Sequence, residues 1–160
     1  MWKWLAIAAL VVIVDQATKL AAEHWLEYQE PVALIPFLNL ALSYNTGAAF
    51  SFLSDAGGWQ RWFFAALAVV VSVVVALWLW RLDADERWTG VALALVLGGA
   101  IGNVIDRLAY GHVIDFIDFY VGDWHWPTFN IADSGISIGV AMLIIDSLFR
   151  RKPAAQGADR

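Results

Sequence analysis

The chain has 160 residues, of which 61% are hydrophobic and 16% charged, and its formal net charge at pH 7 is −5. An ordinary globular domain carries about 25% charged residues, so this composition excludes a typical water-soluble protein and favours one membrane-embedded domain. The acidic balance argues against a nucleic-acid partner, because phosphate binding needs a basic face. The absence of cysteine excludes disulfides, thiol catalysis and cysteine-ligated metal.

The first predicted membrane span covers about residues 4–22. Its basic start and apolar run also fit a cleavable signal peptide. Asp15 and Lys19 interrupt the second half of the run, however, so we expect a retained helix. These two residues are four positions apart and share one helix face, which predicts a buried ion pair.

The segment that follows, about 24–60, is too short between its prolines to span a membrane. Its β-favouring alternation predicts a small strand pair at the membrane surface. The second span, about 62–80, contains no charged residue, and a short charged turn at 81–87 leads to the third. A bilayer is crossed by about 20 apolar residues of helix.

The third predicted span, about 88–106, ends in polar residues. Asn103, Asp106 and Arg107 are spaced i, i+3 and i+4, which places them on one helix face. A glycine-rich stretch at 98–102 precedes them, and such small residues allow helices to approach each other closely.

The second outer segment, about 108–129, contains Asp115 and Asp118. Alternation places Phe116 opposite Asp115, which predicts an extended strand with one face on the bilayer. From spacing alone these aspartates are equally well explained as solvated turn residues. The histidines are interpreted as interfacial polar groups rather than metal ligands; they are His24, His112 and His125.

The fourth predicted span, about 131–149, has Asp133 in its first turn and Asp146 in its last. We expect Asp146 simply to reach the lipid headgroups. The fold predicted from these elements is an all-α integral membrane protein with four transmembrane helices and a small β-rich outer region. Residues 1–152 form its single domain, and 153–160 form a disordered tail.

The distribution of Lys and Arg predicts that both termini are cytoplasmic. In that topology seven of the ten basic residues lie on the inner side, including the cluster at 150–152. The outer side then holds only Lys19, Arg61 and Arg107.

Polar residues from three spans are predicted to meet at one depth. At a rise of 1.5 Å per residue, Asp15 lies roughly 18 Å up the first helix from Lys3, and Asn103 lies roughly 21 Å up the third from Thr89. Asp133 is within one turn of the outer end of the fourth helix. Ionisable residues inside spans are costly and mark functional sites, so a site is predicted in the outer half of the membrane.

Aspartates are the candidates for chemistry at this site. The sequence has no His-Glu-x-x-His zinc motif, no Gly-x-Ser-x-Gly elbow and no cysteine. Two neighbouring carboxylates cannot both ionise easily, so one keeps a proton and the other acts as a base. Such a pair activates water for attack on a peptide carbonyl.

Five blocks of sequence, in this order and spacing, resemble the signatures of the lipoprotein signal peptidase family, the aspartic peptidases also called signal peptidase II. The likeness extends from the first span to the fourth. The blocks are Asp15-Gln-Ala-Thr-Lys19, Asn45-Thr-Gly-Ala-Ala-Phe50, Gly98-Gly-Ala-Ile-Gly-Asn-Val-Ile-Asp-Arg107, Val113-Ile-Asp-Phe116 and Phe129-Asn-Ile-Ala-Asp-Ser134.

The resemblance implies a catalytic pair of Asp115 and Asp133, with no cofactor and no metal. It implies a set of residues that position the substrate or the pair, namely Asn45, Asn103, Arg107 and Asn130. It also implies structural support from Asp15, Lys19 and Asp106. We further expect the first outer loop to clamp the substrate through Asn45 and Gly47.

The implied substrate is a bacterial prolipoprotein whose lipobox cysteine carries diacylglycerol, cut on the N-terminal side of that cysteine. The enzyme is then expected in the bacterial inner membrane as a monomer in contact with lipid, with its active site near the outer face.

Three alternatives remain at this point. One is a small carrier with a relay through Asp15, Lys19 and Asp133. Another is a non-catalytic membrane chaperone, which would need no single carboxylate. The third is a metal-dependent peptidase that uses Asp115, Asp118, Asp133 and His112.

Overall fold

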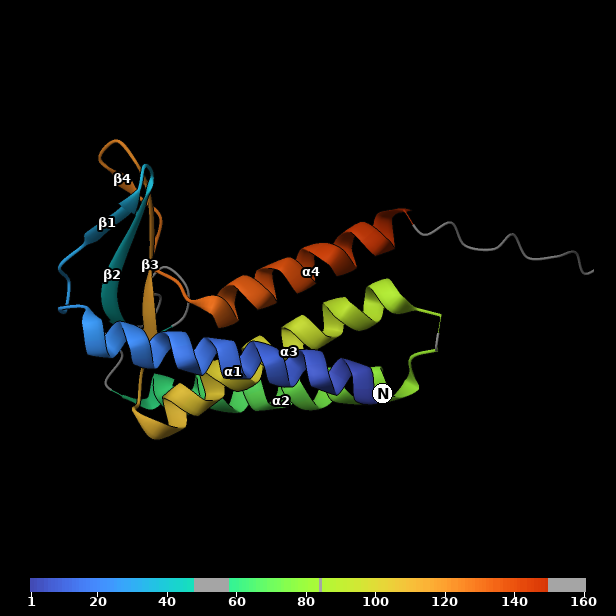
Figure 1. Cartoon of the computed structure of the whole chain (residues 1–160). Helices are drawn as coiled ribbons and strands as arrows, with labels where there is room; N and C mark the ends of the chain where they lie inside the picture. Colours follow the sequence, from blue (N-terminus) through green and yellow to red (C-terminus); the bar gives the residue numbers. More distant parts are fainter. Residues whose placement is uncertain (48–57, 84, 150–160) are drawn as a thin grey trace, which may run out of the picture.

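The computed structural model describes residues 1–47, 58–83 and 85–149. The predicted tail at 153–160, the basic cluster at 150–152 and the last three residues of the 45–50 block lie outside this part. The described elements are α1 (Trp2–Trp25), β1 (Val32–Ile35), β2 (Leu38–Asn45), α2 (Trp59–Arg81), α3 (Arg87–Ala109), β3 (Val113–Val121), β4 (Trp124–His125) and α4 (Ile131–Phe149) (Figure 1).

All four helices in the described ranges are long and apolar enough to cross a membrane, which confirms the predicted spans. The first three are a few residues longer than predicted, and α4 matches the predicted 131–149. The extra turns contain polar residues such as Glu23 and Gln60 that fit a helix but not the hydrocarbon core. Hydropathy therefore locates the part of each helix in lipid, and the helix continues into the interface.

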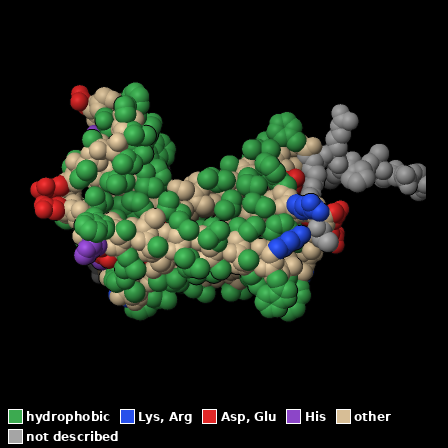
Figure 2. All heavy atoms as spheres, viewed as in Figure 1, with side chains coloured by type: hydrophobic (Ala, Val, Ile, Leu, Met, Phe, Trp, Pro, Cys, Tyr) green, Lys and Arg blue, Asp and Glu red, His purple; other side chains and the backbone are tan. Residues whose placement is uncertain are grey.

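Helix α3 is the centre of the bundle, since it packs against α1, α2 and α4. In its most apolar stretch 67% of the residues are buried, against 22% or less in the other three helices. The outer helices instead present large apolar side chains on the surface, as Figure 2 shows along the length of the bundle. This surface suits contact with lipid.

Glycines let the helices approach α3 closely, as the sequence predicts. A Cβ added at Gly98 would lie 2.6 Å from the Ala8 carbonyl oxygen of α1. One added at Gly102 would lie 2.5 Å from a carboxylate oxygen of Asp15. This stretch of α3 therefore lets α1 approach closely enough to place Asp15 against Gly102.

The strands form one antiparallel sheet in the order β1-β2-β3-β4. It stands at the end of the bundle where α1 ends and α4 begins (Figure 1). The pair β1–β2 confirms the strand pair predicted in the first outer segment, and β3 confirms the strand predicted around Asp115. A bulge between Leu40 and Ser43 bends β2, so that Ser43 pairs with Asp115.

The face of the sheet that is buried and the face that is exposed differ from the prediction. Phe116, opposite Asp115, is only 7% exposed and packs with Ala22 of α1 and Leu42. The expectation that this face lies on the bilayer is wrong, because the end of α1 covers it.

Exposed apolar residues lie on the other face, the one that carries Asp115. Strand pairing places there Val32, Ile35, Phe119, Val121 and Trp124, all more than 40% exposed. On the opposite face, the positions in the same part of the sheet, away from the helix bundle, carry mostly polar side chains: Asn39, Asp118, Tyr120 and His125. This part of the sheet is therefore amphipathic.

Candidate active site

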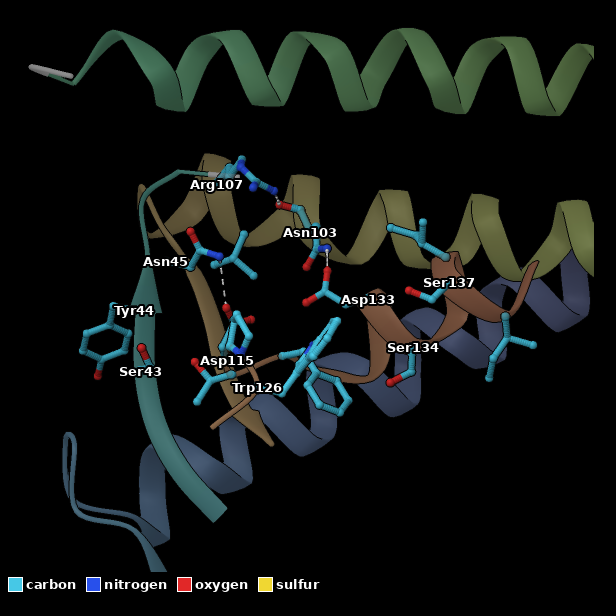
Figure 3. Close-up of a pocket in the computed structure, with 16 residues that line it drawn as sticks. Ser43, Tyr44, Asn45, Asn103, Arg107, Asp115, Trp126, Asp133, Ser134 and Ser137 are labelled. Atoms are coloured by element: carbon cyan, nitrogen blue, oxygen red, sulfur yellow. Dashed lines mark hydrogen bonds between the residues drawn. The ribbon is translucent and has the colours of Figure 1, made fainter. Parts of the chain in front are cut away.

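A pocket of about 710 Å³ lies between the Asp115 face of the sheet and the first turns of α4 (Figure 3). One wall comes from β2 and β3, another from α3, and the floor from the start of α4. Its polar lining includes five of the predicted site residues: Asn45, Asn103, Arg107, Asp115 and Asp133.

Asp133 is held at the start of α4 by a reciprocal cap. The side-chain oxygen of Asn130 accepts a hydrogen bond from the Asp133 N–H at 2.9 Å. In return, Asp133 Oδ2 accepts one from the Asn130 N–H at 3.3 Å. This is the capping-box arrangement, in which the first and fourth residues of a helix start satisfy each other's backbone donors. The sequence that begins the helix thus also positions a carboxylate.

The other oxygen of Asp133 faces α3. Asn103 Nδ2 donates to Asp133 Oδ1 at 2.8 Å (Figure 3). Both oxygens of Asp133 therefore accept a hydrogen bond, one from the backbone at the start of α4 and one from a side chain of the buried helix α3.

Asp115 is fixed by two side-chain amides. Asn130 Nδ2 donates to Asp115 Oδ1 at 2.7 Å, and Asn45 Nδ2 donates to Asp115 Oδ2 at 3.2 Å. Asn45 is itself oriented, because its oxygen accepts the Gly47 N–H at 3.0 Å. Asn130 therefore binds one aspartate through its side-chain amide and the other through its backbone, which joins the pair.

Burial, and after it the negative charge of Asp133, raise the pKa of Asp115 to about 7. Hydrogen bonds from Asn45 and Asn130 and the charge of Lys19 oppose this shift. Asp115 is only 1% exposed, so its charged form loses nearly all its hydration. Near neutral pH it is thus a carboxyl able to hold or release a proton.

A buried ionic cluster lies directly behind the pocket. Lys19 Nζ lies 2.9 Å from Asp15 Oδ2, which confirms the predicted ion pair, and 2.7 Å from Asp106 Oδ2. All three side chains are at most 1% exposed. Asp15 also accepts the Ala132 N–H at 2.8 Å, and Asp106 accepts the Ile114 N–H at 3.1 Å. The cluster thus ties α1 to α3, to α4 and to β3.

Arg107 lies at the edge of the pocket and is 9% exposed. It donates to the Gly47 carbonyl at 3.0 Å and to the Asn103 carbonyl at 3.4 Å. Its Nε is buried and has no acceptor among the described residues. Through its other two nitrogens Arg107 therefore ties the end of the first outer segment to α3 at the edge of the pocket.

Asp118 is not brought to this site. Its carboxylate accepts a hydrogen bond from Asn39 Nδ2 at 2.9 Å and lies 2.8 Å from His125 Nδ1, on the opposite face of the sheet. The described residues hold no group of three or more acidic or histidine side chains arranged for a metal. The four-residue metal site considered from the sequence therefore does not assemble in the described part of the chain.

Two polar residues within spans have partners that the sequence analysis missed. Asp146 accepts a hydrogen bond from Thr89 of α3 at 3.1 Å, so it does more than reach the headgroups. Gln16 donates to Asp106 at 2.8 Å and to Asp15 at 3.2 Å. A polar amide beside Asp15 in an apolar run was a usable signal for Gln16, as was the Asn-x-x-Asp pattern for the cap at Asn130.

Comparison with known proteins gives a consistent family. Residues 7–149 match the model of the family described as signal peptidase (SPase) II. A lipoprotein signal peptidase of Paraburkholderia phymatum is 55% identical over 151 residues, covering 94% of this chain and 90% of the relative. One of Hydrogenovibrio crunogenus is 58% identical over 152 residues, covering 94% and 86%.

The fold is similar to that of a bacterial membrane enzyme solved by the in meso method at 2.3 Å resolution. The TM-score is 0.82 at 33% identity, over 98% of this chain and 96% of that one. Family match, relatives and fold agree over nearly the whole length. The chain is a multi-pass bacterial membrane protein that belongs to the signal peptidase II family.

Proposed function

We propose that this protein is an intramembrane aspartic endopeptidase that removes signal peptides from bacterial prolipoproteins, with Asp115 and Asp133 as the catalytic pair. The observation that carries the assignment is the junction at Asn130, which holds a carboxyl of β3 and a carboxyl of α4 in one pocket. The carrier alternative is not favoured, because the family match is to a peptidase over most of the chain.

The chemistry follows from one proton shared by two carboxyls. The ionised member takes a proton from water as the water oxygen attacks the scissile carbonyl carbon, and the protonated member gives its proton to the carbonyl oxygen. The resulting diol then collapses. One hydroxyl proton returns to a carboxylate, the amide nitrogen receives the other carboxyl's proton, and the C–N bond breaks.

Arg107 and Asn45 are proposed to hold the substrate and the dyad in place. Arg107 lines the pocket and donates to the Gly47 carbonyl. Asn45 contacts Asp115 and Gly47 contacts Arg107, so the first loop reaches both sides of the pocket. An Asn45→Ala enzyme that cleaves with wild-type rate and affinity would contradict this role.

The proposed substrate carries diacylglycerol on the cysteine that follows the scissile bond, and cleavage is on its N-terminal side. The pocket continues along α4 as far as Ile136 and Ile138, and Ile138 is 54% exposed. Acyl chains can therefore stay in lipid beside α4 while the peptide enters the polar end of the pocket. The sheet's exposed apolar face borders the same space (Figure 2).

The proposed orientation places both termini in the cytoplasm and the active site near the outer face. Lys and Arg side chains gather at the bundle end opposite the sheet (Figure 2), as the positive-inside rule requires of a cytoplasmic side. The amphipathic sheet suits an interface, with its apolar face against the outer leaflet.

The test is cleavage of a diacylglyceryl-modified prolipoprotein by the purified protein in lipid. Wild type is compared with Asp115→Asn and Asp133→Asn, each with and without chelator. Chelator-resistant cleavage that is lost in both variants is the expected result. Cleavage that survives either substitution would remove that aspartate from the pair, and chelator sensitivity would point to a metal mechanism.

A further inference from the structure

The ammonium of Lys19 decides which way the Asn103 amide points. Lys19 Nζ lies 3.1 Å from Asn103 Oδ1, and an ammonium has donors only, so the amide oxygen must face it. The amide NH₂ is then turned toward Asp133, to which it donates at 2.8 Å. A chain of two hydrogen bonds thus runs from a buried cation to one member of the catalytic pair.

The connection to the other member differs: Asn130 Nδ2 donates both to Asn103 Oδ1 at 3.3 Å and to Asp115 Oδ1 at 2.7 Å, so no chain of donors runs from Lys19 to Asp115. The amides that bind Asp115 belong to Asn45 and Asn130, and both are oriented by backbone N–H groups, those of Gly47 and Asp133. These donors are neutral. A hydrogen bond donated to a carboxylate favours its charged form, and a nearby cation favours it more.

The other charged groups act at longer range. Arg107 of α3 and Lys19 itself interact electrostatically with both Asp115 and Asp133, and Asp15 interacts with Asp133. Asp15 and Asp106 are each paired directly with Lys19. The directed hydrogen-bond chain through the Asn103 amide is the contact that Asp133 has and Asp115 lacks.

We propose that Lys19 is a positioning residue for catalysis, which acts through Asn103 to keep Asp133 ionised as the base and so leaves the shared proton on Asp115. This rests on the proposed function. It goes beyond support of the fold, because neutralising the two carboxylates of the cluster does not require the contact with Asn103.

The first test separates this role from a structural one. Lys19→Met alone would leave two unpaired buried carboxylates, which is strongly destabilising. The double variant Lys19→Met/Asp106→Asn keeps the cluster's net charge, because it removes one positive and one negative group. Asp106→Asn alone is the matched control, since it retains Lys19 and its contact with Asn103.

The readout is the acid limb of the pH dependence of kcat/KM, which reports the pKa of the base in the free enzyme. Relative to Asp106→Asn, the double variant is expected to shift this limb upward by about one pH unit, with about tenfold lower kcat/KM on the acid side. A structural role would lower the amount of folded enzyme and leave the midpoint unchanged. Equal midpoints in two folded variants would overturn the proposal.

Asn103→Asp provides a second test that keeps a partner for Lys19. It removes the NH₂ donor and places a like charge beside Asp133, so the acid limb is expected to rise by more than about one unit. An unchanged limb would overturn the proposal even if the double variant does not fold. Wild-type protein that fails to cleave would instead refute the proposed function itself.

Discussion

Asn130 performs two separable tasks, and its variants are predicted to separate them. Asn130→Ser keeps a neutral oxygen that can cap α4 but loses the NH₂ that binds Asp115. Asn130→Ala loses both, and the missing cap costs about 1 kcal/mol of stability. We expect both variants to lower kcat, because both lose the donor that orients Asp115, while Asn130→Ala unfolds at a lower temperature than Asn130→Ser because it also loses the cap. Thermal unfolding in detergent beside a cleavage assay checks this, and a wild-type kcat in either variant would contradict it.

Asp115 should make stability depend on pH in a defined direction. Its pKa is raised by burial to about 7 from 3.8, so the folded state binds a proton that the unfolded state has already released. Stability therefore falls as pH rises between these two values and levels off above the higher one. Asp115→Asn removes this loss. The gain in unfolding temperature of Asp115→Asn over wild type should be larger at pH 8 than at pH 4, and a constant difference would contradict the assignment.

The sheet presents two faces that should meet different surroundings. Val121 lies on the apolar face and is 52% exposed, whereas Tyr120, its neighbour, lies on the polar face beside His125. Because the chain has no cysteine, Val121→Cys and Tyr120→Cys each offer one labelling site. We expect an environment-sensitive fluorophore in lipid vesicles to report an apolar setting at Val121→Cys and water at Tyr120→Cys. Identical spectra at the two positions would show that the sheet does not rest on the bilayer.

Patterns within single segments predicted the helices and strands of this fold, but they did not predict which elements would pack against each other. Hydropathy located the spans, and helical spacing gave the Asp15–Lys19 pair. The second partner of Lys19, Asp106, lies on another helix, and no pattern within one helix shows which neighbour it will face. Alternation separates Asp115 from Asp118, but only the strand register decides which of them meets α4. The family resemblance pointed to Asp115 because the family motif at 113–116 contains this aspartate and not Asp118.

The whole molecule is built so that its two ends differ in charge and in structure. The sheet and pocket occupy one end, and Lys3, Arg81 and Arg87 lie at the other (Figures 1 and 2). Because translocated ends are poor in Lys and Arg, the sheet end is predicted to face outward.

Single cysteines at the two ends test this orientation. Asp123→Cys lies in the exposed turn between β3 and β4, and Asp85→Cys in the exposed turn between α2 and α3. In intact spheroplasts, a membrane-impermeant thiol reagent should label Asp123→Cys and should reach Asp85→Cys only after permeabilisation. Both substitutions remove one exposed carboxylate, so the pair is matched in chemistry and differs only in the end it reports. Labelling of Asp85→Cys alone in intact spheroplasts would invert the topology and place the pocket that holds Asp115 and Asp133 on the cytoplasmic side.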